Sequence, residues 1–212
     1  MRSVDDEAPP ICCAQLSASG FTEQGPAAAL AAVGRAFRQR RAVVLHGFLS
    51  PELDRLLAPI WRAATFELQS LPGLGERRVE APGRTADALC LMLTRPRLLR
   101  WVEALTGCGR LGGVAGDVVQ MQAGGREHLG WHDDGSEHDR RLGLTVNLGA
   151  EPYAGGVFEL RRKSAGEVIF RHQHGEPGAA ALFDVGPGLE HRVTPLDAGG
   201  PRTVFAGWFT GA

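Results

Sequence analysis

The chain has 212 residues, of which 43% are hydrophobic and 22% charged, and its formal net charge at pH 7 is −1. These values are ordinary for one globular domain. The near-zero charge and the lack of long runs of like charge argue against nucleic acid or an acidic membrane surface as a partner, and no apolar run approaches the ~18 residues that span a bilayer.

The N-terminal part of the chain predicts helices. We expect a flexible N-terminal segment over 1–20, whose start MRSVDDEAPP lacks the basic-then-apolar pattern of a secretory signal. The segment 26–38 is rich in helix formers with apolar residues on one face, which predicts a helix. The segment 40–48 then reads as a short buried strand.

Further helix signals follow at two places. Ser50 before Pro51 is typical of a helix start, and a third helix is expected near Pro96. Between them, residues 70–88 contain several glycines and prolines and are expected to form a long loop.

The second half of the chain changes character after Gly107. Short β-prone segments, each ended by Gly, Pro or polar residues, succeed one another: DVVQMQ, LGLTVNLG, GGVFELRR, EVIFRH, AAALFDV, EHRVTP and TVFAGWFT. Closely spaced strands of this kind predict an antiparallel sandwich or barrel. We therefore expect a mainly β fold in which two or three N-terminal helices support the core. The domain is expected to span 21–212, with helical support to about 107 and the β core from about 108.

A dense polar cluster opens the segment WHDDGSEHDRRLGLTVNLG. Residues i and i+2 of an extended strand point to the same face, so His132 and Asp134 are expected to project together and Asp133 away from them. A His-x-Asp pair alone is a weak signal.

The C-terminal part of the chain supplies the context. His191 lies 57 residues beyond Asp134, and Arg202 follows 11 residues later. Two histidines and one carboxylate on one face of a metal form the facial triad of non-haem iron(II) oxygenases. Arg202 on the return strand is suited to a bidentate contact with a carboxylate.

These motifs together resemble the iron(II)/2-oxoglutarate-dependent dioxygenases. The resemblance rests on His132-x-Asp134, the Gly-Gly pair before VFEL, His191 with RVTP, and Arg202, and covers roughly Val118 to Phe209. It is closest to the compact prolyl-4-hydroxylase-like branch. It implies a double-stranded β-helix (a jelly-roll, cupin-like core), Fe(II) held by the two histidines and the aspartate, and 2-oxoglutarate and O2 as cosubstrates.

The resemblance also implies roles for the charged residues. Arg202 would pair with the distal carboxylate of 2-oxoglutarate, although the branch often has its basic residue one position nearer the distal histidine. We attribute the difference to a longer turn in DAGGP. Asp134 favours hydroxylation over halogenation, because related halogenases have a small residue there.

Other cosubstrate contacts are predicted by strand alternation. Family members often contact 2-oxoglutarate with a tyrosine or another polar residue on the strand after the His-x-Asp pair. The one tyrosine, Tyr153, falls in an expected turn, so Thr145 and Asn147 are our candidates. Gln122 on the entering strand and Val193 beyond His191 complete the set. For the three polar residues, an interior hydrogen bond is the alternative.

Substrate contacts are expected near the mouth of the barrel. The candidates are Arg126, His128, His138 and Trp208. Asp133 is expected to face solvent.

A rival metal motif is present in RHQHGEPG. His172 and His174, followed by Glu176, resemble the metal motif of cupins, but Gly175 and the glycine and proline beyond it favour an exposed hairpin tip. A non-catalytic cupin-like module that binds or senses a ligand is therefore the alternative to an enzyme.

The expected activity is hydroxylation of an unactivated C–H bond of an amino-acid side chain, free or in a peptide, with natural-product tailoring as one setting. A non-peptide metabolite is the alternative substrate. We expect a monomer or homodimer. The four cysteines form no CxxC pair, which favours reduced thiols in a cytoplasmic protein.

Overall fold

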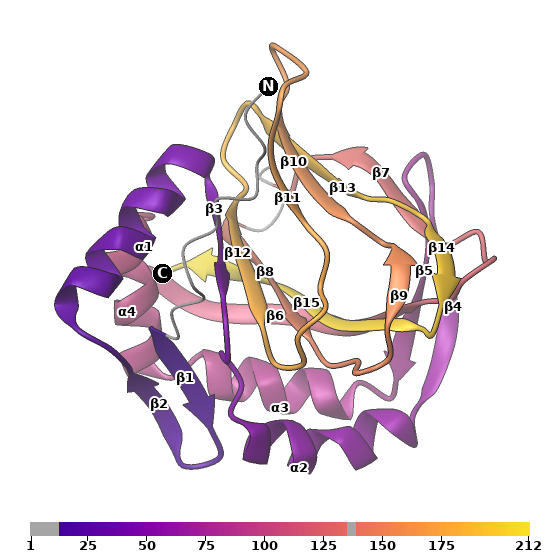
Figure 1. Cartoon of the computed structure of the whole chain (residues 1–212), viewed down its shortest axis with the longest axis horizontal. Coiled ribbons are helices and arrows are strands. Elements are labelled where there is room, and N and C mark those ends of the chain that lie inside the picture. The colour runs from indigo at the N-terminus through magenta and orange to yellow at the C-terminus, as the bar shows by residue number, and fades with distance from the viewer. Residues whose placement is uncertain (1–12, 135–138) are drawn as a thin grey trace.

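The computed structural model describes residues 13–134 and 139–212. Its main feature is an eleven-stranded sheet that curls into a nearly closed barrel, with helices packed against its outer side (Figure 1). Every strand pair in this sheet is antiparallel. The mainly β fold predicted from the sequence, a double-stranded β-helix supported by helices, is confirmed.

The main sheet has the order β11-β10-β13-β7-β5-β6-β15-β8-β12-β3, and β4 pairs with β5. The strands of this sheet are β3 (Ala42–Leu45), β4 (Thr65–Leu71), β5 (Gly75–Ala81), β6 (Leu111–Met121), β7 (His128–His132), β8 (Arg140–Asn147), β10 (Phe158–Arg162), β11 (Val168–His172), β12 (Ala180–Asp184), β13 (Leu189–Val193) and β15 (Arg202–Gly211). Two short ribbons complete the strands: β1 (Ala14–Ser17) with β2 (Gly20–Glu23), and β9 (Tyr153–Gly155) with β14 (Leu196–Gly199).

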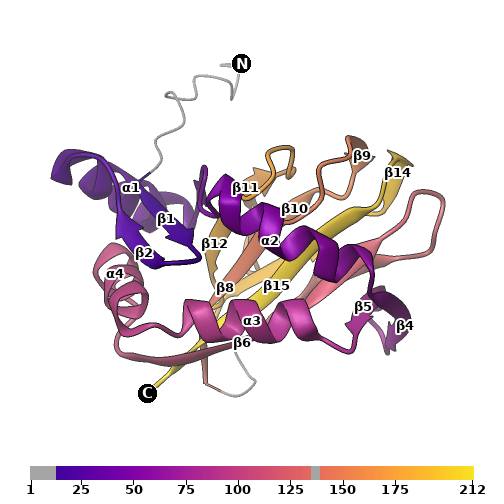
Figure 2. The same cartoon turned by 90° about the horizontal axis from the view of Figure 1, so that it is seen from below.

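Four helices lie in the first half of the described chain: α1 (Ala27–Arg40), α2 (Pro51–Arg62), α3 (Arg84–Leu93) and α4 (Pro96–Thr106). Helices α3 and α4 pack on β6, and α2 lies beside α3 (Figure 2). The predicted start signal of α2 is confirmed, because Ser50 Oγ accepts a hydrogen bond from the Leu53 amide at 3.1 Å. No helix in these described residues is long and apolar enough to cross a membrane.

The β8 strand shows why the sheet and the helices pack together. Leu142, Leu144 and Val146 are at most 1% exposed and belong to the apolar cluster between the sheet and the helices. Burying a side chain of this size stabilises the fold by ~1.5–3 kcal/mol, so the strand is held with one face outward. The alternate residues, which include Thr145, are thereby turned toward the inside of the barrel.

The expected long loop over 70–88 is wrong. These residues hold the end of β4, all of β5 and the start of α3. Most side chains of both strands are polar, those of β4 being mostly exposed and those of β5 mostly part-exposed. The strands therefore show little apolar alternation and are specified by pairing with their neighbours. The sequence also gives no local signal for the start of α3, because its cap lies four residues upstream. There, buried Glu80 accepts hydrogen bonds from the amides of Thr85 and Ala86.

Two other expectations need revision. The helices number four in the described chain, where two or three were expected. Residues 14–17, inside the segment expected to be flexible, form β1, and Leu16 there is fully buried. Residues 1–12 lie outside the described chain.

Candidate metal centre

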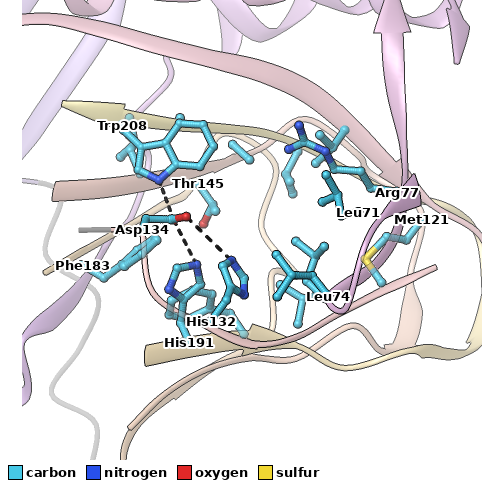
Figure 3. A pocket seen from close by; sticks show the side chains of 18 of the residues that line it. Leu71, Leu74, Arg77, Met121, His132, Asp134, Thr145, Phe183, His191 and Trp208 are labelled. Carbon is cyan, nitrogen blue, oxygen red and sulfur yellow. Dashed lines mark hydrogen bonds and ion pairs between the residues drawn. The ribbon is translucent and has the colours of Figure 1, made fainter. Parts of the chain in front are cut away.

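Three side chains predicted to act together converge inside the barrel. His132 ends β7 and His191 lies in β13, and the two residues are direct partners across these strands, with their rings 4.2 Å apart. Asp134 follows two residues after β7. Its carboxylate lies 3.9 Å from Nε2 of His132 and 3.4 Å from Nε2 of His191 (Figure 3).

The three ligand atoms all lie within 4.8 Å of one another, which is close enough for one metal ion. Across residues 13–134 and 139–212, no other group of histidine, cysteine and carboxylate side chains meets that condition. The geometry therefore offers two imidazoles and one carboxylate from one side.

Both histidines present Nε2 to this point. Nδ1 of His132 lies 2.7 Å from the carbonyl oxygen of Gly130 and donates to it, which leaves Nε2 with its lone pair. Burial, and to a smaller extent neighbouring His132, hold the pKa of His191 well below its usual value. His191 is therefore neutral at physiological pH, as metal ligation requires.

Asp134 is oriented by two donors. Nε1 of Trp208 donates to Oδ2 at 2.6 Å, and Nη1 of Arg140 donates to Oδ1 at 3.1 Å. The guanidinium of Arg140 also stacks over the Trp208 ring, 3.8 Å from its centre. These contacts fix the carboxylate against the histidines and compensate its charge where it is buried.

The triad forms one side of a cavity of about 200 Å³. Its walls are mostly apolar, and the β4–β5 hairpin supplies Leu71, Leu74 and Arg77 to them, with Leu74 beside His132 (Figure 3). The polar lining consists of the triad with Arg77, Arg140, Thr145, Arg202 and Trp208.

Arg202 is the unusual member of this lining. Its side chain is 2% exposed, yet Nε and Nη2 have no hydrogen-bond partner within the described chain, and Nη1 reaches only the sulfur of Met121 at 3.9 Å. Burial lowers the pKa of Arg202, and Tyr153 beside it opposes that shift. A buried, unpaired guanidinium is costly, so this position favours an anionic ligand.

The Gly-Gly pair that was noted in the sequence makes room for this arginine. Gly156 has φ +60°, and a Cβ atom there would lie 2.9 Å from Cδ of Arg202 and 2.5 Å from Cδ1 of Leu196. A side chain at Gly156 would therefore displace Arg202 from the cavity wall.

Comparison with known families agrees with this geometry. Residues 117–210 match the model of a family described as the 2OG-Fe(II) oxygenase superfamily. The matched part is most of the β core, which is therefore similar to the 2OG-Fe(II) oxygenase superfamily. A search of curated protein sequences finds no significant match.

Several solved structures share the fold of this chain. A prolyl-4-hydroxylase from Pseudomonas putida is 20% identical, with 86% of this chain and 99% of that chain covered and a TM-score of 0.63. A 2OG-Fe(II) oxygenase family oxidoreductase from Burkholderia pseudomallei is 17% identical, with 92% and 95% covered and a TM-score of 0.60. The epimerase SnoN from nogalamycin biosynthesis is 16% identical, with 88% and 85% covered and a TM-score of 0.62.

Fe(II) and 2-oxoglutarate are the metal and cosubstrate typical of this superfamily, and the residues present fit both. The three converging ligands suit Fe(II). The orphaned donors of Arg202 suit the second carboxylate of 2-oxoglutarate, since the two lie on the lining of one cavity.

Tyr153 was dismissed in the sequence as a turn residue, but it begins β9 and lies next to Arg202. Its hydroxyl is buried and has no hydrogen-bond partner in the described residues. Burial raises the pKa of Tyr153, and the neighbouring Arg202 opposes this. The one signal for this position in the sequence is that Tyr153 lies two residues before the Gly-Gly pair that makes room for Arg202.

The other predicted cosubstrate residues divide into two groups. Thr145 and Val193 line the cavity. Asn147 is buried behind the wall and donates to the carbonyl oxygen of Glu176 at 3.0 Å, which is the interior hydrogen bond named as its alternative. Gln122 lies just past β6, exposed, while its neighbour Met121 lines the cavity.

The predicted substrate residues also divide. Trp208 lines the cavity, whereas Arg126 and His128 are exposed, and Nδ1 of His128 contacts the Arg126 carbonyl oxygen at 2.8 Å. His138 lies outside the described residues. Asp133 is exposed and pairs with Lys163, which agrees with its expected outward direction.

The expectation that His172 and His174 form an exposed tip is wrong for His174, which is 2% exposed. Nε2 of His174 contacts Oγ1 of Thr145 at 2.9 Å, and Nδ1 contacts Nε2 of His172 at 3.1 Å. Glu176 instead pairs with His46 at 2.7 Å. The rival metal motif therefore does not assemble here, because its histidines turn inward and bond to each other.

Proposed function

We propose that this chain is an Fe(II)- and 2-oxoglutarate-dependent hydroxylase that acts on an unactivated C–H bond of an amino-acid side chain, free or in a peptide. The observation that carries the proposal is the unpaired Arg202 guanidinium, which is buried on the same small cavity as the triad. A metal-binding module alone has no need of this costly charge. A chelating cosubstrate with a second carboxylate accounts for both features.

In this proposal His132, Asp134 and His191 hold Fe(II), and Arg202 binds the distal carboxylate of 2-oxoglutarate. Bound Fe(II), with 2-oxoglutarate and O2, supplies the oxidising power that breaks a C–H bond, while 2-oxoglutarate is converted to succinate and CO2. Trp208 and Arg140 hold the Asp134 carboxylate in place. The apolar walls exclude water from the reacting atoms.

The part of the cavity wall that the β4–β5 hairpin forms supports a substrate with an aliphatic part and a polar main chain. Leu71 and Leu74 offer apolar surface there (Figure 3). Arg77 on the same wall uses Nε for Gln69 and Nη2 for Asp117, and its remaining N–H groups suit a carbonyl or carboxylate oxygen. An amino-acid residue carries both features, and a prolyl-4-hydroxylase is among the proteins with this fold.

A non-peptide metabolite is the second candidate, because the epimerase SnoN, from nogalamycin biosynthesis, shares the fold at a TM-score of 0.62. The same triad would then serve another outcome, such as epimerisation. The two candidates are separated by the product: hydroxylation adds one oxygen atom to an amino acid or peptide, whereas epimerisation leaves the mass unchanged.

The proposal is tested by succinate formation. Purified protein with Fe(II), 2-oxoglutarate and O2 is expected to form succinate, and a panel of amino acids and short peptides is expected to contain members that stimulate it and gain one oxygen by mass spectrometry. The His191→Ala variant is expected to lose this activity. If wild-type protein forms no succinate with any member or without substrate, the non-catalytic binding module is favoured instead.

We also propose a reducing compartment such as the cytoplasm. Cys13, Cys90 and Cys108 are free thiols, and burial raises the pKa of Cys90 and of Cys108, so both stay protonated and unreactive. Sedimentation of the purified protein tests whether it is the monomer or the homodimer that we propose.

A further inference from the structure

A chain of three polar side chains lies behind the cavity wall, outside the metal centre. Thr145 of β8 lines the cavity, and its Oγ1 lies 2.9 Å from Nε2 of His174. Nδ1 of His174 lies 3.1 Å from Nε2 of His172. Thr145 is 7% exposed and His174 is 2% exposed, so this Thr145–His174–His172 chain is sealed from bulk water at its centre.

The chain lies near Arg202. Thr145 and Arg202 come from the neighbouring strands β8 and β15 and line the same cavity. Burial, followed by the charge of Arg202, holds the pKa of His174 well below its usual value. Burial, followed by His46 and then Arg202, lowers the pKa of His172 to about 4. Both histidines are therefore neutral at physiological pH.

Two neutral histidines restrict the direction of the hydrogen bonds. A neutral imidazole has one N–H donor and one bare nitrogen acceptor. If Nε2 of His174 carries the proton, it donates to Oγ1 of Thr145, and Nδ1 accepts from Nε2 of His172. The hydroxyl hydrogen of Thr145 is then left to point into the cavity.

The opposite direction gives the opposite result. If Nδ1 of His174 carries the proton, Nε2 accepts the hydroxyl hydrogen of Thr145. Thr145 then presents only oxygen lone pairs to the cavity and cannot donate to an anion there. An anion held by Arg202 selects the first direction, because a hydrogen bond to a charged acceptor is stronger than one to a neutral acceptor.

We propose that His174 and His172 are positioning residues, which direct the hydroxyl hydrogen of Thr145, already expected to contact 2-oxoglutarate, toward the carboxylate that Arg202 binds. This inference rests on the proposed function, since it assumes that 2-oxoglutarate occupies the cavity. It assigns a use to buried His174 and part-buried His172, which the triad does not need.

The inference is tested by the affinity for two 2-oxoacids, measured anaerobically by calorimetry with Mn(II) in place of Fe(II). 2-Oxoglutarate has the distal carboxylate, and 2-oxopentanoate has the same chain length and metal-binding end without it. The Thr145→Val variant keeps the shape of the side chain and removes the hydroxyl. We expect it to bind 2-oxoglutarate roughly 10- to 100-fold more weakly, as for loss of a hydrogen bond to a charged group, with 2-oxopentanoate unaffected.

Two further variants separate positioning from packing. Thr145→Ser keeps the hydroxyl and is expected to restore most of the affinity for 2-oxoglutarate. His174→Phe keeps a buried ring and removes the donor to Thr145. We expect its affinity for 2-oxoglutarate to fall roughly 3- to 10-fold and its affinity for 2-oxopentanoate to stay constant. Thermal melting shows that each variant is folded before binding is measured. If Thr145→Val does not fold, the test rests on His174→Phe, through the ratio of its affinities for 2-oxoglutarate and 2-oxopentanoate.

The outcomes distinguish this inference from the proposed function. If wild-type protein with Mn(II) binds neither 2-oxoacid, the proposed function fails and the inference fails with it. If wild-type protein prefers 2-oxoglutarate and Thr145→Val keeps that preference, or weakens both acids equally, the proposed function stands and the role given to Thr145 and the histidines is overturned.

Discussion

The two ends of the cavity are built on opposite electrostatic principles. At the metal end, the Asp134 carboxylate is compensated before any metal binds, because Trp208 and Arg140 donate to it and two histidines face it. At the other end, the buried charge of Arg202 has no compensating carboxylate in the described residues, and its neighbours Tyr153 and His174 are neutral.

This difference predicts opposite responses to substitution. Removing the charged group at the metal end takes away the carboxylate that accepts from both Arg140 and Trp208 and is expected to destabilise the protein. Removing the charge at the Arg202 end relieves an unpaired buried cation. The ligand-free protein thus carries a free-energy cost at the Arg202 end only, which 2-oxoglutarate would offset on binding under the proposed function.

The largest effect is expected for Asp134→Ala. Loss of a metal ligand is expected to weaken Mn(II) binding by more than the roughly 10- to 100-fold typical of residues that only orient ligands, and to remove most succinate formation. The matched control is Asp133→Ala, one residue away, which removes only an ion pair between part-exposed side chains with Lys163. Equal metal affinity in the two variants, measured by calorimetry, would contradict the assignment of Asp134.

Arg202→Met tests most directly the difference in charge compensation between the two ends of the cavity. Losing the charged partner of a buried carboxylate costs roughly 2–5 kcal/mol, so the affinity for 2-oxoglutarate with Mn(II) is expected to fall roughly 30-fold or more. The melting temperature of the ligand-free variant is expected to be equal to or above that of wild type, because the unpaired charge is gone. A strongly lowered melting temperature would show that Arg202 is already compensated.

The two ends also differ in how far the sequence predicts them. Strand alternation and order along the chain predict a shared face for four residues: His132, Asp134, His191 and Arg202. They do not predict the direct pairing of His132 with His191, since the register between strands 59 residues apart depends on the whole barrel.

His174 and the β4–β5 hairpin show why part of the structure could not be predicted from the sequence. Gly175 and the Pro-Gly that follows it predicted a turn near His174, but a turn signal describes the path of the backbone and not the direction of a side chain. His174 lies on the inner side and meets Thr145 from a strand 29 residues away. Likewise, the mostly polar β4–β5 hairpin has little apolar periodicity, although it supplies Leu71, Leu74 and Arg77 to the cavity.

Trp208→Phe gives a smaller effect at the metal end. It keeps an aromatic ring beneath Arg140 and removes the Nε1 donor to Asp134, which is expected to weaken Mn(II) binding roughly 10-fold. The control is Trp131→Phe, because Trp131 stacks with Arg161 and Arg192 and does not line the cavity. An unchanged Mn(II) affinity for Trp208→Phe would show that Arg140 alone orients the carboxylate.

The smallest effect is expected for Tyr153→Phe at the Arg202 end. The hydroxyl of Tyr153 is buried without a hydrogen-bond partner in the described residues, so removing it is expected to leave the ligand-free melting temperature unchanged or slightly raised. If the hydroxyl donates to the carboxylate held by Arg202, the affinity for 2-oxoglutarate falls roughly 3- to 10-fold and that for 2-oxopentanoate stays constant.

The combination of Tyr153→Phe with Thr145→Val then shows whether both hydroxyls serve the same carboxylate. Donors that share one anion are coupled, so their losses in binding free energy should not add, whereas independent sites add within ~0.3–0.5 kcal/mol. Additive losses, or an equal loss for both 2-oxoacids, would mean that Tyr153 acts on Arg202 or on packing. The Arg202 end would then depend on one hydroxyl and one guanidinium to hold the carboxylate.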